Sequence, residues 1–281
     1  MNKPTLELSF EFFPPRSPEA EARLLTTVNE LCVCKPEFFS VTFGAGGSTR
    51  EKTLETVLSI REQTPIESVP HISCIGFPVE DIRQVLQRYR DNGFKSLVAL
   101  RGDLPSGAAG GGSLRYANEL VEFIRAETGD HFRLYVACYP EVHPQSHGVA
   151  RDMDNFKRKV DAGADAAITQ YFYNIDAYLH FLESCRSQQI DIPIIPGVMP
   201  IINCTQLLRF SEACGAEVPR WITKRLQDFG DDRASIKKFG IEVTTHLCEQ
   251  LIKNGADNLH IYTMNQSEAS LAIRQNLGLD G

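Results

Sequence analysis

The segment SLVALRGD at residues 96–103 is a short apolar run that is followed at once by charged residues. Similar apolar runs recur in LYVACY at residues 134–139 and in IPIIPGV at residues 192–198. Near-continuous apolar runs of this length are typical of parallel strands that are buried on both faces of a sheet. Eight such segments predict strands over residues 6–12, 38–43, 69–75, 96–100, 134–139, 167–171, 192–198 and 258–263.

Amphipathic helical stretches alternate with these strands. The first is expected to begin at Ser17-Pro18, because proline is favoured at the first position of a helix. A longer helical insertion is predicted over residues 219–254, before the last strand. Eight βα units in a row without a linker predict an α/β protein with a single (β/α)8 TIM barrel over residues 1–281. The alternative, an open doubly wound sheet, would need a glycine-rich phosphate turn where residues 12–16 read FFPPR.

Composition excludes several classes of protein. The chain has 281 residues, 42% hydrophobic and 23% charged, which is ordinary globular usage and fits one barrel domain. A net charge of −7 and the lack of a basic run argue against nucleic-acid partners. No apolar run is long enough to span a membrane, and the N-terminus has no apolar signal core, so we expect a cytoplasmic location. The eight cysteines, none with CxxC spacing, are expected to be reduced and mostly buried.

Polar or ionisable side chains lie at or near the ends of seven of the eight predicted strands. In a barrel these ends converge on one mouth, where the reacting groups of TIM-barrel enzymes lie. The sequence therefore predicts an active site at this mouth. Its candidates, one from each of the seven strands, are Glu11, Thr42, His71, Asp103, His143, Gln170 and Asn265.

Three of these candidates also have a structural interpretation. Glu11 lies within the apolar run FEFF, where a carboxylate must be paired or protonated, and a protonated one suits a general acid. A salt bridge to Arg16 is the alternative. Asp103 follows Arg101 by two residues and could form a local ion pair with it. His71 could equally be a hydrogen-bonded histidine of the core.

Two further patterns have alternative interpretations. Asp152, Asn155 and Lys159 share one helix face, which is either solvated or contacts a phosphate or ribose. Glu141 and two nearby histidines, His143 and His147, have partial metal-ligand spacing, but no further ligand is close in the sequence. We predict no metal site, and a metal-dependent barrel lyase or hydrolase is the alternative function.

Eight segments together resemble the 5,10-methylenetetrahydrofolate reductases, and the resemblance runs from the first strand to the last. They are FEFFPPR (10–16), SVTFGAGGST (40–49), PHISC (70–74), ALRGDLP (99–105), YPEVHP (139–144), KVDAGADAAITQ (159–170), IPGVMP (195–200) and HIYTMN (260–265). The resemblance is to the compact bacterial type, which consists of the catalytic barrel without a regulatory domain.

The resemblance implies an oxidoreductase with non-covalently bound FAD. NADH or NADPH first reduces the flavin and leaves, and 5,10-methylenetetrahydrofolate then takes the hydride and becomes 5-methyltetrahydrofolate. This ping-pong reaction supplies methyl groups for methionine synthesis. The partners implied are these small molecules and further copies of the chain in a homo-oligomer. A folate-binding protein that has lost its flavin is the second alternative.

The resemblance also implies roles for individual residues. Glu11 is the acid that opens the methylene bridge, and Asp103 is the carboxylate that contacts the pterin near the flavin. The other substrate contacts implied are Thr42, Gln170, Gln206, Phe210 and, with a departure described below, Gln266. The FAD contacts implied are Phe43, Ala45, His71, Arg101, Gly102, Asp103, Ala117, Tyr139, His143, Asp152, Asn155, Arg158 and Lys159.

Two positions depart from the family pattern. The family usually has Tyr where this chain has Phe43, which removes a hydroxyl contact near the flavin. It often has Arg where this chain has Gln266. We therefore expect no charge-assisted contact from position 266 to the carboxylate tail of the folate.

Overall fold

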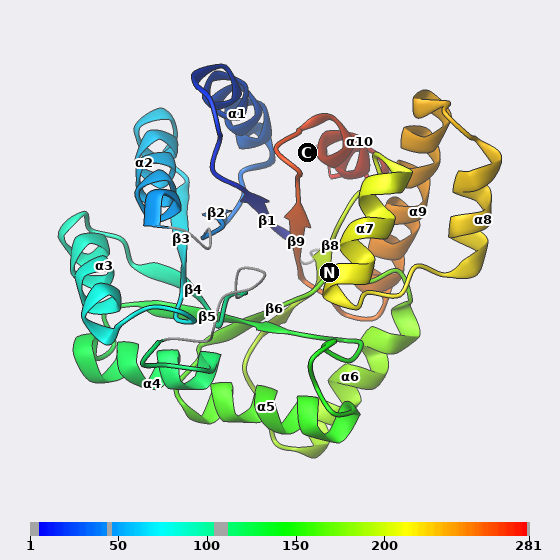
Figure 1. Ribbon diagram of the computed structural model, residues 1–281. Helices are drawn as coiled ribbons and strands as arrows, with labels where there is room; N and C mark the ends of the chain where they lie inside the picture. The colour runs from blue at the N-terminus through cyan, green and yellow to red at the C-terminus, as the bar shows by residue number, and fades with distance from the viewer. Residues whose placement is uncertain (1–5, 44–46, 104–111, 280–281) are drawn as a thin grey trace, which may run out of the picture.

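A computed structural model of the protein describes residues 6–43, 47–103 and 112–279. The described strands are all parallel and form one sheet in the order β7-β6-β5-β4-β3-β2-β1-β9-β8. Figure 1 shows this sheet curled at the centre of the molecule with the helices around it. The strands are β1 Glu7–Phe12, β2 Phe38–Val41, β3 Glu67–Ser73, β4 Ser96–Leu100, β5 Arg133–Cys138, β6 Ala166–Thr169, β7 Ile194–Ile195, β8 Gly197–Val198 and β9 Asn258–Tyr262.

The helices alternate with the strands as the sequence predicts. They are α1 Pro18–Leu31, the 3₁₀ helix η1 Cys32–Cys34, α2 Gly47–Gln63, α3 Val79–Asp91, α4 Ala117–Thr128, α5 Val149–Asp161, α6 Ile175–Ser187, α7 Cys204–Cys214, α8 Arg220–Asp228, α9 Arg233–Lys253 and α10 Glu268–Asn276. At the start of α1 the Ser17 hydroxyl accepts a hydrogen bond from the Ala20 amide at 3.2 Å, with Pro18 as the first helical residue. The (β/α)8 barrel is confirmed.

The predicted strand over residues 192–198 is split into β7 and β8, and Pro196 separates the two halves. Proline has no amide hydrogen and cannot continue a strand ladder as a donor. Its carbonyl still accepts from the His260 amide at 3.0 Å. Because β7 pairs with β6 and β8 pairs with β9, the two halves bring the ends of the sheet together in a nearly closed barrel.

Alternation along the strands places side chains in two layers. On the inside, Phe38, Tyr135 and Ile168 pack together in the barrel interior. On the outside, residues such as Phe10 and Val136 pack between the sheet and the helices. Successive side chains of a strand point to opposite faces, so each strand contributes to both layers.

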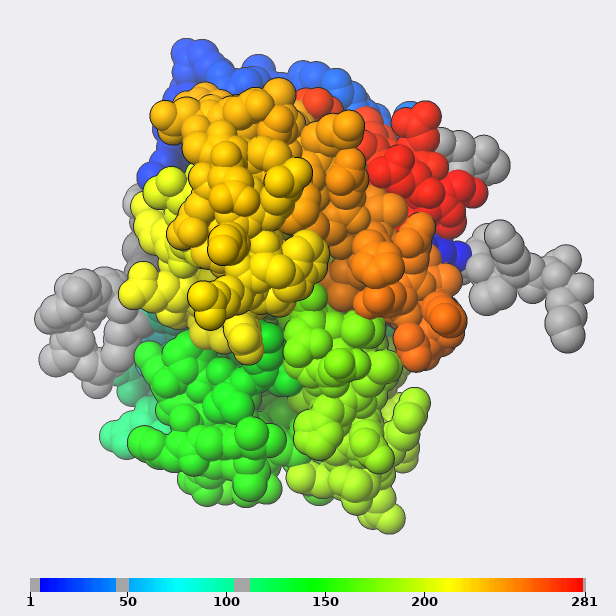
Figure 2. All heavy atoms as spheres, turned by 90° about the vertical axis from the view of Figure 1, so that its right-hand side faces the viewer, coloured from blue at the N-terminus to red at the C-terminus, as the bar shows by residue number. Residues whose placement is uncertain are grey.

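The predicted helical insertion lies between β8 and β9 as α8 and α9, which follow α7. Figure 2 shows α8 and α9 as an outer layer on one side of the molecule, above α5 and α6. Gly240 of α9 packs directly on the chain after β8, because a Cβ at this position would lie 1.9 Å from the Ile201 carbonyl oxygen. This close approach holds the insertion against the barrel.

All eight cysteines are free, as expected, and four of them are buried while the other four are partly exposed. The expectation of mostly buried thiols therefore holds for half of them. Among the described helices, none is both long and apolar enough to cross a membrane.

Candidate active site

Two adjoining cavities open at the carboxyl ends of the barrel strands. Cavity A has a volume of about 560 Å³ and lies over β4 and β5 and along α5. Cavity B has a volume of about 480 Å³ and lies over β1, β3, β6 and β9. The residues that line both cavities are Leu100, Asp103, Ala137, Tyr139, His143 and Gln145. A ligand in cavity A would therefore share a boundary with a ligand in cavity B.

Most of the predicted FAD contacts line cavity A, although they come from four separate parts of the chain. They are Arg101, Gly102, Asp103, Ala117, Tyr139, His143, Asp152, Asn155, Arg158 and Lys159. Phe43 and His71 line cavity B instead. Ala45 lies outside the described residues.

Cavity B collects the predicted catalytic and substrate residues. Glu11, Thr42, Asp103, Gln170 and Phe210 all line it. Gln206 and Gln266 are not among the lining residues of either cavity, and their assignment to the substrate stays a prediction. Gln206 lies one helical turn before Phe210 on α7, whereas Gln266 is exposed just beyond the end of β9.

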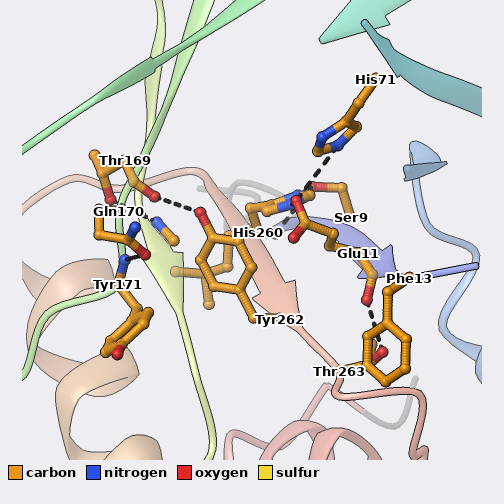
Figure 3. Close-up of polar contacts among 12 residues, drawn as sticks. Ser9, Glu11, Phe13, His71, Thr169, Gln170, Tyr171, His260, Tyr262 and Thr263 are labelled. Atoms are coloured by element: carbon orange, nitrogen blue, oxygen red, sulfur yellow. Dashed lines mark hydrogen bonds and ion pairs between the residues drawn. The ribbon is translucent and has the colours of Figure 1, made fainter. Parts of the chain in front are cut away.

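The Glu11 side chain is 18% exposed at cavity B, and two histidines face it from neighbouring strands (Figure 3). Its Oε2 atom lies 3.4 Å from His71 Nε2 and 3.5 Å from His260 Nε2. Within the described chain, the side chains that approach the Glu11 carboxyl group are thus histidines of β3 and β9 and not Arg16. The carboxyl group is therefore partly buried, and the alternative salt bridge to Arg16 is replaced by two histidines.

The phenylalanines on either side of Glu11 do not surround its carboxyl group. Phe10 and Phe12 belong to the layer between the sheet and the helices, on the opposite face of β1. Strand geometry sends successive side chains to opposite faces, so sequence neighbours of Glu11 are not its spatial neighbours. The side chains that approach the Glu11 carboxyl group come from β3 and β9, and the local sequence FEFF contains no information about them.

The chemistry of this cluster depends on the protonation of its imidazoles. Burial lowers the pKa of His71 to about 4, and this effect outweighs the opposing attraction of Glu11. His71 is therefore neutral near pH 7. Its ring nitrogens have no hydrogen-bond partner among the described residues, so it is not a hydrogen-bonded core histidine. A neutral imidazole can donate to a carboxylate or accept from a carboxylic acid, so the site accommodates Glu11 with or without its proton.

His260 is a site residue that the sequence analysis did not identify. It is fully buried in β9, and its Nδ1 lies 2.8 Å from the Ser9 hydroxyl (Figure 3). Two residues further along β9, Tyr262 lines cavity B and donates to the Thr169 carbonyl at 2.7 Å. The two-residue alternation in NLHIY is the signal that would have placed both side chains on the inner face.

The methylenetetrahydrofolate reductase family model matches residues 1–278. The chain belongs to this family. The 5,10-methylenetetrahydrofolate reductase of Escherichia coli K12 is 39% identical over 274 residues, which cover 98% of this chain and 91% of that protein. The methylenetetrahydrofolate reductase (NADH) 1 of Zea mays is 38% identical over 286 residues, which cover 96% of this chain but 48% of that protein.

A solved structure shares the fold at low sequence identity. It is described as an uncharacterized protein from Clostridium thermocellum that binds two copies of 5-methyl-5,6,7,8-tetrahydrofolic acid, and it superposes with a TM-score of 0.70 at 15% identity. The match covers 99% of this chain and 96% of that one. This likeness concerns the barrel alone, whereas the sequence relatives establish membership of the reductase family.

Lys159 is a partly buried cation that lines cavity A of this reductase-family barrel. It lies near the end of α5, and its ammonium group donates to the Ala137 carbonyl in β5. Burial lowers the pKa of Lys159, because the charged form loses hydration. An anionic group in cavity A would restore a favourable environment for this charge.

His143 presents a hydrogen-bond donor at the boundary between the two cavities. Its Nδ1 accepts from the Gln145 amide at 3.0 Å, so a neutral ring carries its proton on Nε2. Burial lowers the pKa of His143, which favours this neutral form. The carboxylate of Asp152 accepts from the His143 amide at 3.1 Å, and the Tyr139 ring packs edge-on at 4.7 Å. The loop after β5 is thereby held in place.

Asp103 forms only a loose version of the ion pair that the sequence suggested. Its Oδ1 lies 3.8 Å from the Arg101 guanidinium, and its side chain is 96% exposed. An exposed pair at this distance contributes little to stability. Asp103 is therefore available to a ligand at the boundary of the two cavities.

The metal-dependent alternative has no assembled ligand set in the part of the chain that the structure describes. Among the described residues, no group of three or more His, Cys, Asp or Glu side chains is arranged so that it could hold a metal ion. Glu141 accepts instead from the Glu217 amide at 2.7 Å, and His143 uses its Nδ1 within the loop.

The donors around cavity A fit a flavin dinucleotide. Arg101, Arg158 and Lys159 supply positive charge, and Ala117 is the first residue of α4, where backbone amides favour an anion. Gly102, at φ +81°, packs so closely on β3 that a Cβ there would lie 2.8 Å from the Ser73 Cβ. The cavity volume is within the range of known ligand sites. These residues would hold the pyrophosphate and ribose of such a dinucleotide.

Proposed function

We propose that this chain catalyses the NAD(P)H-dependent reduction of 5,10-methylenetetrahydrofolate to 5-methyltetrahydrofolate, with FAD bound non-covalently in cavity A. The observation that carries the proposal is the position of Glu11. It lies in cavity B, which shares the lining residues Asp103, Tyr139 and His143 with the cationic cavity A. A carboxyl group that could donate a proton thus lies beside a cavity that could hold a dinucleotide, and this arrangement supports the proposed reaction. The sequence relatives named as reductases support the same activity.

The protein residues would bind, orient and transfer a proton. FAD, when bound, supplies the hydride chemistry. Glu11 would donate a proton to a nitrogen of the folate bridge, which opens the bridge to a reactive iminium. Positioned general acids of this kind contribute about 10²–10⁴-fold to the rate. The neutral imidazole of His71 can donate a hydrogen bond to the Glu11 carboxylate or accept one from its carboxylic acid, so it would serve both forms of Glu11 during the proton transfer.

One cavity for two substrates would explain a ping-pong order. Thr42, Gln170 and Phe210 line the same cavity B, so the nicotinamide and the folate would occupy it in turn. Phe210 lies on α7, whose last turn is held by a contact between Ser211 and Tyr171 at 3.0 Å. This contact would keep the aromatic wall in place for both substrates.

We further propose that the enzyme acts in the cytoplasm as a homo-oligomer and that its product supplies methyl groups for methionine synthesis. The eight free cysteines support a reducing compartment. The oligomer and the pathway rest on family membership.

An absorption spectrum tests the proposed function directly. The purified protein is expected to show a flavin spectrum, or to acquire one on addition of FAD. Under anaerobic conditions NADH or NADPH should bleach this spectrum, and methylenetetrahydrofolate should restore it. A protein that takes up no FAD would contradict the proposal. If the nicotinamide bleached the flavin but the folate did not restore its spectrum, the proposed nicotinamide half-reaction would stand and the proposed folate half-reaction would be contradicted.

Gln266→Arg is expected to tighten folate binding about 2- to 5-fold, the range for an exposed charge pair. Gln266 is exposed just beyond Met264, which lines cavity B, so a longer cationic side chain could approach the folate tail. The dissociation constant of 5-methyltetrahydrofolate should fall while the FAD content stays the same. An unchanged constant would show that another residue binds the tail.

A further inference from the structure

Phe13 is an aromatic side chain that the proposed mechanism does not use. It lies two residues beyond Glu11, lines cavity B, and is 43% exposed (Figure 3). Its ring has no aromatic partner among the described residues. Ligand cavities are typically lined by aromatic side chains that become covered when the ligand binds.

The backbone of Phe13 is held on both sides by one side chain from the far end of the sequence. The Asn265 Oδ1 accepts from the Phe13 amide at 3.0 Å, and the Asn265 Nδ2 donates to the Phe13 carbonyl at 2.9 Å. Pro14 follows directly and restricts Phe13 to extended conformations. Two hydrogen bonds and a proline therefore fix the base of an exposed ring.

Asn265 is itself held in an unusual conformation. Its φ is +56°, a left-handed conformation that asparagine tolerates better than most residues. Its amide donates to the Thr263 hydroxyl at 3.0 Å. This hydroxyl donates to the Glu11 carbonyl at 2.7 Å (Figure 3). The same few residues thus hold the end of the strand that carries Glu11 and the backbone of Phe13.

We propose that Phe13 is a substrate-binding residue of cavity B that packs its ring against a planar aromatic ring of the ligand, and that Asn265 is its positioning residue. The proposal rests on the proposed function, because that function supplies ligands with such rings in the folate and the nicotinamide. A backbone fixed before binding lowers the conformational entropy that is lost when the ligand orders the Phe13 side chain. Its contact adds to affinity through aromatic packing beyond the area that is buried.

The test measures dissociation constants of the FAD-loaded enzyme for 5-methyltetrahydrofolate and, separately, for NAD⁺ by calorimetry. Phe13→Leu is expected to weaken binding of at least one ligand about 3- to 10-fold. Phe13→Tyr, which keeps the aromatic ring, should bind this ligand with an affinity close to that of the wild type. The ligand that is affected identifies the ring that packs on Phe13. Trp221→Leu is the matched control, because Trp221 is 60% exposed on α8, outside the lining of both cavities.

A double-mutant cycle tests the role of Asn265. Asn265→Ala should weaken binding of the same ligand that Phe13→Leu affects. The double variant should bind this ligand no more weakly than Phe13→Leu alone. Additive effects would show that Asn265 does not act through Phe13.

Three results would overturn the proposal. Equal affinities in the wild type and Phe13→Leu would show that the ring does not contact either ligand. A loss of FAD or of thermal stability in both Phe13→Leu and Phe13→Met would make Phe13 a structural residue. A wild-type protein that binds FAD but neither ligand would refute the proposed function itself, which is a different failure from the first.

Discussion

Glu11→Gln is expected to leave flavin reduction by NADH near the wild-type rate and to slow flavin reoxidation by methylenetetrahydrofolate about 10²–10⁴-fold. Hydride transfer from the nicotinamide needs no proton from Glu11, whereas opening of the folate bridge does. Glutamine has the same shape, and its amide can donate to the imidazoles of His71 and His260, which face Glu11 at 3.4 and 3.5 Å. The two half-reactions are followed by anaerobic stopped-flow absorbance of the flavin.

Glu7→Gln is the matched control for this variant. Glu7 lies on the same strand and the same face of β1, but at the opposite end of the barrel. Both half-reactions should remain unchanged in it. If Glu11→Gln slowed both half-reactions alike, Glu11 would be a structural residue and the proton-donor role would be wrong.

Lys159→Met is expected to weaken FAD binding about 10- to 150-fold, the range for losing a hydrogen bond to a charged group. Methionine keeps much of the apolar length of lysine but has no charge for a pyrophosphate. The Lys159 ammonium lies partly buried at cavity A, where an anion would offset its lost hydration. The dissociation constant is measured by quenching of FAD fluorescence, and Lys159→Arg should recover part of the affinity.

Lys157→Met on the same helix provides the control. The Lys157 ammonium pairs with Asp161 at 3.0 Å on the exposed side of α5, and Lys157 does not line cavity A. Its loss should change neither FAD affinity nor thermal stability appreciably, because exposed pairs of this kind contribute little. A Lys159→Met protein that bound FAD normally but melted at a lower temperature would assign Lys159 to packing of the barrel instead.

Much of the barrel could be predicted because its signals are local. The apolar run at residues 96–100 is a strand with the predicted bounds, and the helix after Ser17 begins where its cap and proline indicate. The break at Pro196 was not predicted as such. The apolar run continues through this residue, and only the pairing of β7 with β6 and of β8 with β9 shows that the ladder divides there.

The sequence predicted where the candidate site lies in the barrel, but it did not predict which side chains contact one another there. The ends of parallel strands must converge, which is why Glu11, Asp103 and Gln170 line one cavity. The partners of Glu11 could not be derived in this way. His71 and His260 are 60 and 249 residues away along the chain, and neither lies near Glu11 in any local pattern.

The sequence by itself determined the class of fold, the order of strands and helices, and the family, because each depends on periodicity or on motifs carried by consecutive residues. Only the tertiary structure decided which side chains face one another. It placed Glu11 between two buried imidazoles and fixed Phe13 through Asn265, 252 residues away. The physical reason is that barrel closure brings β1 against β9, so contacts across this seam depend on strand register, which no short stretch of sequence contains.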